Sequence, residues 1–226
     1  MEKSVSVIIP CYNYEQYLDE AIQSVLDQSV QTNEIIVVSD GAIDNSVEIA
    51  KKYPVKIIEK ENGGLSSARN VGVEASTSTY CISFDSDDIM RPDCIKEHLK
   101  LAEENTIVTC GLMTFGSESY TARPSQADLP TLLERNVIYS NSLFPRDLCL
   151  EVGGFDEKMV LGLEDWECWI RMAEAGVKFV TNDYIALLWR RHPQAMSEQK
   201  ANPNWAKNME YFRTKHKHLY KQYNIK

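Results

Sequence analysis

Three carboxylates lie within four residues in the segment Asp85-Ser86-Asp87-Asp88, directly after the apolar run at residues 80–84. Three like charges at the end of a strand repel one another unless a cation lies between them. Carboxylate oxygens on a short loop suit a hard divalent ion such as Mg²⁺ or Mn²⁺. The segment therefore indicates a divalent-metal site. The alternative is a solvated acidic turn before the helix that Pro92 opens.

The first half of the chain alternates short β-rich runs with helical patterns, which predicts crossover units and a largely parallel sheet in an α/β fold. In such sheets ligands bind beyond the carboxyl ends of the strands. We expect four strands to end near this edge, because each of the following stretches is polar or glycine-rich. They are residues 10–13, Asp40, residues 62–64 and residues 85–88.

The second half is less regular. Residues 111 to about 128 are rich in Ser, Thr and Gly, which predicts a mobile loop. Glu164 and Asp165 then open a strongly amphipathic helix that ends at Gly176. A helix N-terminus favours ionised carboxylates, so on local grounds these acids favour the start of the helix. Two strand-like runs at residues 178–181 and 185–189 follow.

Composition narrows the class of protein. A net charge of −9 over 226 residues argues against a general nucleic-acid binder, which normally presents a basic face. Six cysteines without a C-x-x-C pair indicate buried reduced thiols rather than disulfides or a zinc site. The chain enters a strand pattern at once and has no apolar run long enough to span a bilayer. We therefore expect a soluble cytoplasmic protein.

The stretch 203–226 carries six Lys or Arg and one acid. Its apolar stripe has helical spacing, and its members are Trp205, Met209, Phe212, His216 and Leu219. The pattern predicts a basic amphipathic helix. Such a helix can bind peripherally to the inner face of a membrane, or contact a partner or a second copy of the chain. Alternatively, it docks on the core of its own protein.

Five stretches, in this order, resemble glycosyltransferase family 2, the inverting nucleotide-sugar enzymes of the GT-A fold. The resemblance extends over about residues 4 to 198. The stretches are residues 5–13 (VSVIIPCYN), 62–70 (NGGLSSARN), 85–88 (DSDD), 153–157 (GGFDE) and 164–165 (ED).

The resemblance implies a Rossmann-like, mostly parallel central sheet flanked by helices, with a smaller acceptor-side subregion. Residues 1–202 would form a single domain, in which residues 1–112 bind nucleotide and metal and residues 113–202 bind the acceptor. Residues 203–226 would be the C-terminal helix.

The resemblance also implies roles on the donor side. Asp40 would face the nucleobase, and Arg69 would lie near the diphosphate. The family usually has Asp-Asp-Gly-Ser-Thr-Asp where this chain reads Ser39-Asp40-Gly41-Ala42-Ile43-Asp44, so Ser39 is a departure that bears on base recognition. The full set implied to bind the nucleotide is Pro10, Tyr12, Asn13, Asp40, Arg69, Asp85 and Ser86.

For the chemistry, Asp85 and Asp87 match the D-x-D that holds Mn²⁺ or Mg²⁺ on the diphosphate, and His192 is a further candidate ligand. Asp165 would be the catalytic base. Remaining candidates for contacts to the diphosphate or the acceptor are Arg191, Glu164 and Trp166.

The expected function is metal-dependent, inverting transfer of a sugar from a nucleoside diphosphate sugar, with UDP favoured. The acceptor would be a saccharide or a lipid-linked saccharide in surface polysaccharide or glycoconjugate synthesis. Alternatives are a catalytically degenerate sugar-nucleotide-binding module, a nucleotidyltransferase and a phospho-acceptor signalling domain. A nucleotidyltransferase should carry a glycine-rich basic loop after the first strand, and residues 10–13 form no such loop.

Overall fold

The computed structural model describes residues 3–225. Met1, Glu2 and Lys226, which belong to the predicted ranges 1–112 and 203–226, lie outside the described residues. The strands are β1 (Val5–Cys11), β2 (Glu34–Asp40), β3 (Lys56–Lys60), β4 (Tyr80–Ser83), β5 (Ile89–Met90), β6 (Thr106–Gly116), β7 (Thr121–Ala122), β8 (Leu143–Pro145) and β9 (Lys178–Arg191). The helices are α1 (Glu15–Leu26), α2 (Ser46–Ala50), α3 (Leu65–Ala75), α4 (Cys94–Leu101), α5 (Leu129–Glu134), α6 (Arg146–Glu151), α7 (Glu164–Glu174), the π-helical turn η1 (Ser197–Ala201), α8 (Trp205–Lys215) and α9 (Lys217–Gln222).

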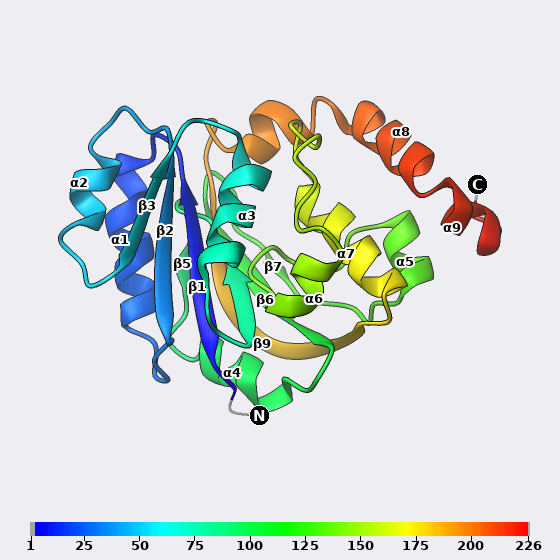
Figure 1. Ribbon diagram of the computed structural model, residues 1–226, viewed down its shortest axis with the longest axis horizontal. Coiled ribbons are helices and arrows are strands. Elements are labelled where there is room, and N and C mark those ends of the chain that lie inside the picture. The colour runs from blue at the N-terminus through cyan, green and yellow to red at the C-terminus, as the bar shows by residue number, and fades with distance from the viewer. Residues whose placement is uncertain (1–2, 226) are drawn as a thin grey trace.

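The strands form one sheet in the order β3-β2-β1-β4-β8-β6-β9-β5, with β7 paired to β6 (Figure 1). The pairs β1–β2, β2–β3, β1–β4 and β6–β9 are parallel and include the longest ones. Strands β5, β7 and β8 pair antiparallel with their neighbours and are short. The predicted α/β fold is confirmed.

Strand β1 is buried on both faces, which explains its nearly continuous apolar sequence. Val7 and Ile9 face the core beneath α1, whereas Ile8 faces the opposite core beneath α3. A Cβ atom at Gly72 of α3 would lie 2.2 Å from Ile8 Cγ2. Glycine at this position therefore lets α3 lie directly on β1, which fixes Arg69 on the same helix over the strand ends.

The second half of the chain differs from the sequence prediction. The loop predicted from Gly111 is wrong for residues 111–116, because β6 continues to Gly116 and pairs with β9 over that length. The two predicted strand runs at 178–181 and 185–189 are one strand, with an irregularity opposite residues 110–112. Pairing with a distant strand, rather than local composition, makes this segment extended.

Three helices of this half begin or end at residues with a recognisable local cause. Helix α5 begins after Asp128, whose Oδ1 accepts a hydrogen bond from Thr131 N at 2.9 Å. Helix α6 ends just before Gly153 and Gly154, both at positive φ. Helix α7 begins at Glu164, as predicted.

The six cysteines are all buried and unpaired, which confirms the prediction of reduced thiols. Within residues 3–225, each helix is too short or too polar to cross a lipid bilayer.

The predicted C-terminal helix is observed as two helices, α8 and α9, joined at His216. Their apolar side docks on the core, where the rings of Phe212 and Trp166 lie 4.9 Å apart and Leu219 is buried. The alternative of docking on the protein's own core therefore describes this stretch. Contact with a membrane or a second copy stays a prediction for the exposed side of α8.

A buried ion cluster fastens these helices to α7. Glu167 is fully buried and accepts hydrogen bonds from Arg171 Nε at 2.9 Å and His216 Nε2 at 2.9 Å, with Lys215 Nζ 2.8 Å away. Burial alone would raise the pKa of Glu167, but the hydrogen bonds from His216 and Arg171 outweigh it and lower the pKa to about 2. The ionised carboxylate is thus the form that the fold stabilises.

Replacing Glu167 with alanine should lower the free energy of unfolding by about 3–5 kcal/mol, because it leaves buried cations unpaired. The exposed pair made by Glu174 offers a matched control, and Glu174→Ala should cost less than about 1 kcal/mol. Urea denaturation at pH 7 measures both. A carboxylate whose pKa is lowered by folding contributes its full stabilisation only above the pKa that it has in the unfolded chain. The loss of unfolding free energy in Glu167→Ala should therefore shrink as the pH falls from about 5 to about 2. A deficit equal to that of the control would contradict the assigned role.

Candidate active site

A cavity of about 640 Å³ opens at the carboxyl ends of the parallel strands. Its volume falls within the range of about 300–1,000 Å³ that ligand sites occupy. Residues that follow β1, β2, β3 and β4 line it together, as the sequence predicts for this edge of the sheet. The polar members from these four strand ends are Tyr12, Asp40, Asn62, Asp85, Ser86, Asp87 and Asp88.

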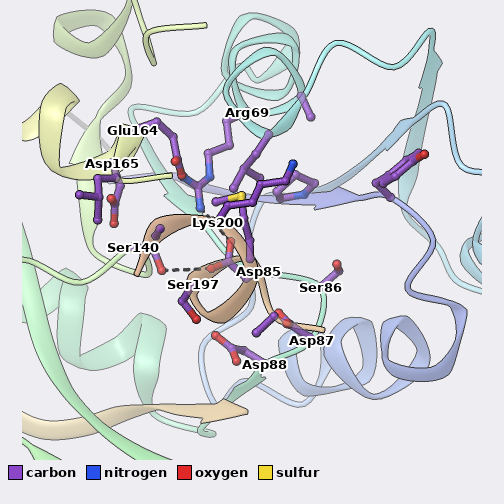
Figure 2. A pocket seen from close by; sticks show the side chains of 18 of the residues that line it. Arg69, Asp85, Ser86, Asp87, Asp88, Ser140, Glu164, Asp165, Ser197 and Lys200 are labelled. Carbon is purple, nitrogen blue, oxygen red and sulfur yellow. Dashed lines mark hydrogen bonds and ion pairs between the residues drawn. The ribbon is translucent and has the colours of Figure 1, made fainter. Parts of the chain in front are cut away.

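The opposite wall of this cavity comes from the N-terminus of α7, with Glu164 and Asp165. In Figure 2, Asp165 and Asp87 lie on opposite sides of Asp85. Two acidic patches nearly 80 positions apart in the sequence therefore face one cavity.

Asp85 follows β4 by two residues, and each of its oxygens has a hydrogen-bond donor. Arg69 Nη2 donates to Oδ1 at 2.8 Å, and Ser140 Oγ donates to Oδ2 at 3.4 Å. Ser140 reaches the cavity from the irregular segment before β8, and no sequence pattern marked it. The contact with Arg69 fixes the direction of the Asp85 carboxylate.

Asp87 points to the far end of β9, where His192 Nε2 lies 2.9 Å from Asp87 Oδ2. Burial raises the pKa of Asp87 despite this hydrogen bond, and the contact with Asp87 raises the pKa of His192. Asp88 is buried and accepts a hydrogen bond from Arg190 N at 2.8 Å, so it anchors β9 to the loop.

The predicted metal ligands Asp85, Asp87 and His192 follow β4 and β9, and Asp87 and His192 are in contact. Within residues 3–225, no group of three or more His, Cys, Asp or Glu side chains is already arranged to hold an ion. Two ligand atoms on adjacent positions of an octahedral ion with bonds of about 2.1 Å are separated by about 3 Å. The 2.9 Å between Asp87 Oδ2 and His192 Nε2 is the length of a hydrogen bond, and it is also compatible with that spacing. These two residues fit a shared divalent ion whose remaining ligands would be Asp85, substrate oxygens and water.

Arg69 links the two walls of the cavity. It is 2% exposed and forms ion pairs with Glu164 of α7 and with Asp85. Although burial alone would lower the pKa of Arg69, the charge of Glu164 and then that of Asp85 raise it. Glu164 Oε2 is buried without a hydrogen-bond partner among the described residues. The bridge positions the start of α7 relative to the loop that carries Asp85.

Asp165 lies on the cavity wall and is half-buried. Burial, and next the charge of Glu164, raise the pKa of Asp165 to about 7. Leu163, immediately before the helix, has a φ of 67°, a left-handed conformation that is costly for a bulky side chain. Helix α7, with Glu164 and Asp165 in its first turn, begins immediately after this strained residue.

The end of the cavity near β1 contains an exposed aromatic ring. Tyr12 is 48% exposed on the cavity wall, and Pro10 and Ser86 line the same region. Asn13 is placed differently from its predicted contact with nucleotide. Its Oδ1 accepts a hydrogen bond from Ile43 N at 2.9 Å, and it does not line the cavity.

Asp40 lines the cavity, and its carboxylate accepts hydrogen bonds from the last residue of β3 and the segment that follows it. Oδ1 accepts hydrogen bonds from Lys60 Nζ at 2.6 Å and Gly63 N at 2.9 Å, and Oδ2 accepts one from Gly64 N at 2.8 Å. Oδ1 already accepts two hydrogen bonds, whereas Oδ2 accepts one, so one lone pair of Oδ2 remains for a further donor. Sequence reasoning did not identify Lys60.

Two predicted contact residues lie away from the cavity. The Arg191 guanidinium pairs with Glu198 and stacks over the Trp189 ring at 4.5 Å, and Arg191 does not line the cavity. Trp166 is fully buried, and its Nε1 donates to Leu132 O at 2.7 Å. Trp166 packs in the core. Neither placement supports the predicted contact with diphosphate or acceptor.

Residues 194–197 and 199–202 supply a wall that sequence reasoning missed. They contain no periodic apolar pattern, and η1 is a π-helical turn that no sequence signal marks. Lys200 and Ser197 from this turn are drawn with the other lining side chains in Figure 2.

The fold and site together define a GT-A architecture, with strand-end carboxylates on one side of a cavity and an acid-led helix on the other. The family model described as glycosyl transferase family 2 matches residues 6–155. The chain belongs to this family.

Among curated relatives, the chain is 38% identical over 138 residues to the uncharacterized glycosyltransferase EpsJ of Bacillus subtilis, covering 58% of this chain and 40% of EpsJ. It is 33% identical over 214 residues to an uncharacterized glycosyltransferase of Rickettsia typhi, covering 87% of this chain and 66% of the relative. This chain thus spans about two thirds or less of the length of these relatives.

Solved structures share the fold at low sequence identity. Staphylococcus aureus TarS 1–349 in complex with UDP-GlcNAc aligns with a TM-score of 0.72 and 20% identity, covering 86% of this chain and 60% of that one. The mannosyltransferase PcManGT of Pyrobaculum calidifontis, in complex with GDP-Man and Mn²⁺, aligns with a TM-score of 0.69 and 19% identity, covering 88% and 60%.

Proposed function

We propose that this chain transfers a sugar from a nucleoside diphosphate sugar to a hydroxyl acceptor, with inversion at the anomeric carbon and with a divalent cation. The observation that carries the proposal is the single cavity lined both by Asp85 and Asp87 and by Asp165. Family membership supports it independently.

On the donor side, Asp87 and His192 fit a shared ion, and Asp85 is held beside them by Arg69. When bound, Mn²⁺ or Mg²⁺ neutralises charge that develops on the leaving diphosphate. Tyr12 offers its exposed ring to the face of the base, and Asp40 offers an acceptor to a base N–H. These side chains hold the donor with its diphosphate toward Asp87.

On the acceptor side, Asp165 takes the proton from the attacking hydroxyl. The oxygen attacks the anomeric carbon as the bond to the diphosphate breaks, so the electron pair leaves with the nucleotide. Attack from the wall opposite the metal ligands inverts the configuration, by the same opposite-face argument as inverting hydrolysis. The N-terminus of α7 favours the ionised Asp165 that this step requires, whereas burial and the charge of Glu164 oppose it and set its pKa at about 7.

We propose UDP as the nucleotide because uracil offers an N–H donor for Asp40, and the structural neighbour TarS is described in complex with UDP and with UDP-GlcNAc. The donated sugar would be a hexose or an N-acetylhexosamine. A saccharide or lipid-linked saccharide acceptor fits a relative named chondroitin synthase from Pasteurella multocida, 38% identical over 105 residues. Surface polysaccharide or glycoconjugate synthesis is the proposed setting.

The test is nucleoside diphosphate release from a panel of UDP-, GDP- and dTDP-sugars, with and without Mn²⁺ or Mg²⁺. We expect release from one base class only, stimulated by metal and by a saccharide acceptor. Binding without turnover would instead indicate a degenerate module, and pyrophosphate release from a nucleoside triphosphate would indicate a nucleotidyltransferase.

The raised pKa of Asp165 predicts an acid limb in the pH profile. A base must be ionised, so kcat/KM should fall about tenfold per pH unit below about 7 and level off above it. Because the charge of Glu164 contributes to this shift, Glu164→Gln should move the limb to lower pH. Initial rates between pH 5.5 and 8.5 in the two proteins test this, and a profile flat to pH 5.5 in the wild type speaks against Asp165 as the base.

A further inference from the structure

The segment after β9 returns over the cavity and brings a cation with it. His192 lies beside Asp87, and the turn η1 then places Lys200 on the cavity wall (Figure 2). The Lys200 side chain is exposed, and its ammonium group has no hydrogen bond or ion pair among residues 3–225.

The charges along the cavity wall make this lysine unusual. Six carboxylates line the cavity: Asp40, Asp85, Asp87, Asp88, Glu164 and Asp165. Of the described residues that line it, two carry permanent cations, and Arg69 is already committed to Glu164 and Asp85. Lys200 is therefore the one uncommitted permanent cation on this wall.

A leaving diphosphate needs more positive charge than the predicted ion supplies. Asp87, with Asp85, would offset much of the charge of one divalent ion, so the departing phosphate oxygens would need a further donor. Arg191 was a predicted candidate for this contact, but its guanidinium is held by Glu198 and the Trp189 ring. The Arg191–Glu198 pair instead ties η1 to the end of β9.

We propose that the Lys200 ammonium group binds the diphosphate of the donor, and that the Arg191–Glu198 pair holds η1 in place for this contact. The inference rests on the proposed function, because it assigns a further binding residue to the same site. No bond to Lys200 forms or breaks in the reaction. The group acts as a hydrogen-bond donor and a positive charge.

The experiment compares the affinities of a nucleoside diphosphate and the matching monophosphate by titration calorimetry, using UDP with UMP and GDP with GMP. Lys200→Met should weaken the diphosphate about tenfold or more, the effect of losing a charged hydrogen bond, and the monophosphate less than about twofold. Lys200→Arg should restore most of the difference. Lys207→Met, an exposed lysine on α8 outside the cavity lining, is the matched control and should change neither affinity.

The outcomes separate two failures. Tight diphosphate binding by the wild type with no change in Lys200→Met, or an equal loss for diphosphate and monophosphate, overturns the role of Lys200 and leaves the proposed function intact. A wild-type protein that binds none of the four nucleotides overturns the proposed function, and the inference with it. Circular dichroism of Lys200→Met should match that of the wild type, since the side chain is exposed.

Discussion

Asp165→Asn is expected to lower kcat by about 10²–10⁴-fold, the usual contribution of a positioned base. Asparagine has nearly the same shape as aspartate but does not accept the hydroxyl proton. Trp166 N donates a hydrogen bond to Asp165 Oδ1 at 2.7 Å. This contact requires only an acceptor oxygen, which asparagine retains. The loss should therefore fall on the chemical step.

Steady-state rates of nucleoside diphosphate release and the dissociation constant for UDP measure this prediction. We expect the UDP affinity of Asp165→Asn to stay within about threefold of the wild type, since Asp165 lies on the acceptor side. Asp183→Asn makes the same chemical change at an exposed position of β9 and should leave the rate unaltered. Normal turnover by Asp165→Asn would show that another group is the base.

Asp87→Ala is expected to remove the metal dependence of donor binding. Asp87 Oδ2 and His192 Nε2 are the two atoms already at the spacing of adjacent ligands. Losing groups that merely support a ligand typically costs 10–100-fold in metal affinity, so losing the ligand itself should cost about 100-fold or more. In the wild type, Mn²⁺ should strengthen UDP binding, and in Asp87→Ala this enhancement should disappear.

Titration of UDP with and without Mn²⁺ tests the prediction, and the electron paramagnetic resonance signal of free Mn²⁺ reports metal binding directly. Asp165→Asn provides the internal comparison, because it should keep the enhancement while losing turnover. Asp93→Asn alters an exposed carboxylate of the same segment outside the cavity lining. If Mn²⁺ still strengthened UDP binding in Asp87→Ala, Asp87 would not be a metal ligand.

The two variants together separate the walls of the cavity. One should lose transfer with donor binding intact, and the other should lose donor binding as well. A single structural collapse predicts the same loss in both, so the contrast is informative even if each protein is somewhat less stable. Arg69 joins the two walls physically, through Asp85 on one side and Glu164 on the other.

The sequence by itself determined the fold of the first half of the chain and the edge of the sheet where its polar residues meet. Buried parallel strands have continuous β-branched runs, and the residues that follow such strands must meet at one edge of the sheet. This is why Asp40, Asp85 and Asp87 were placed together from local patterns alone. The sequence also predicted where α7 begins, because Glu164 and Asp165 precede apolar residues at helical spacing.

Only the tertiary structure decided which side chains reach the cavity from the second half of the chain. Strand β6 extends through a Ser- and Gly-rich stretch because β9 pairs with it, and that pairing carries no local signal. Arg191 and Lys200 are both basic residues close to His192 in the sequence. Arg191 forms an ion pair with Glu198 and does not line the cavity, whereas Lys200 of η1 does. The residue types show which side chains have the charge to bind a diphosphate. Long-range contacts decide which of these side chains is placed to bind one, because they fix where each backbone segment lies and which opposite charges are already paired.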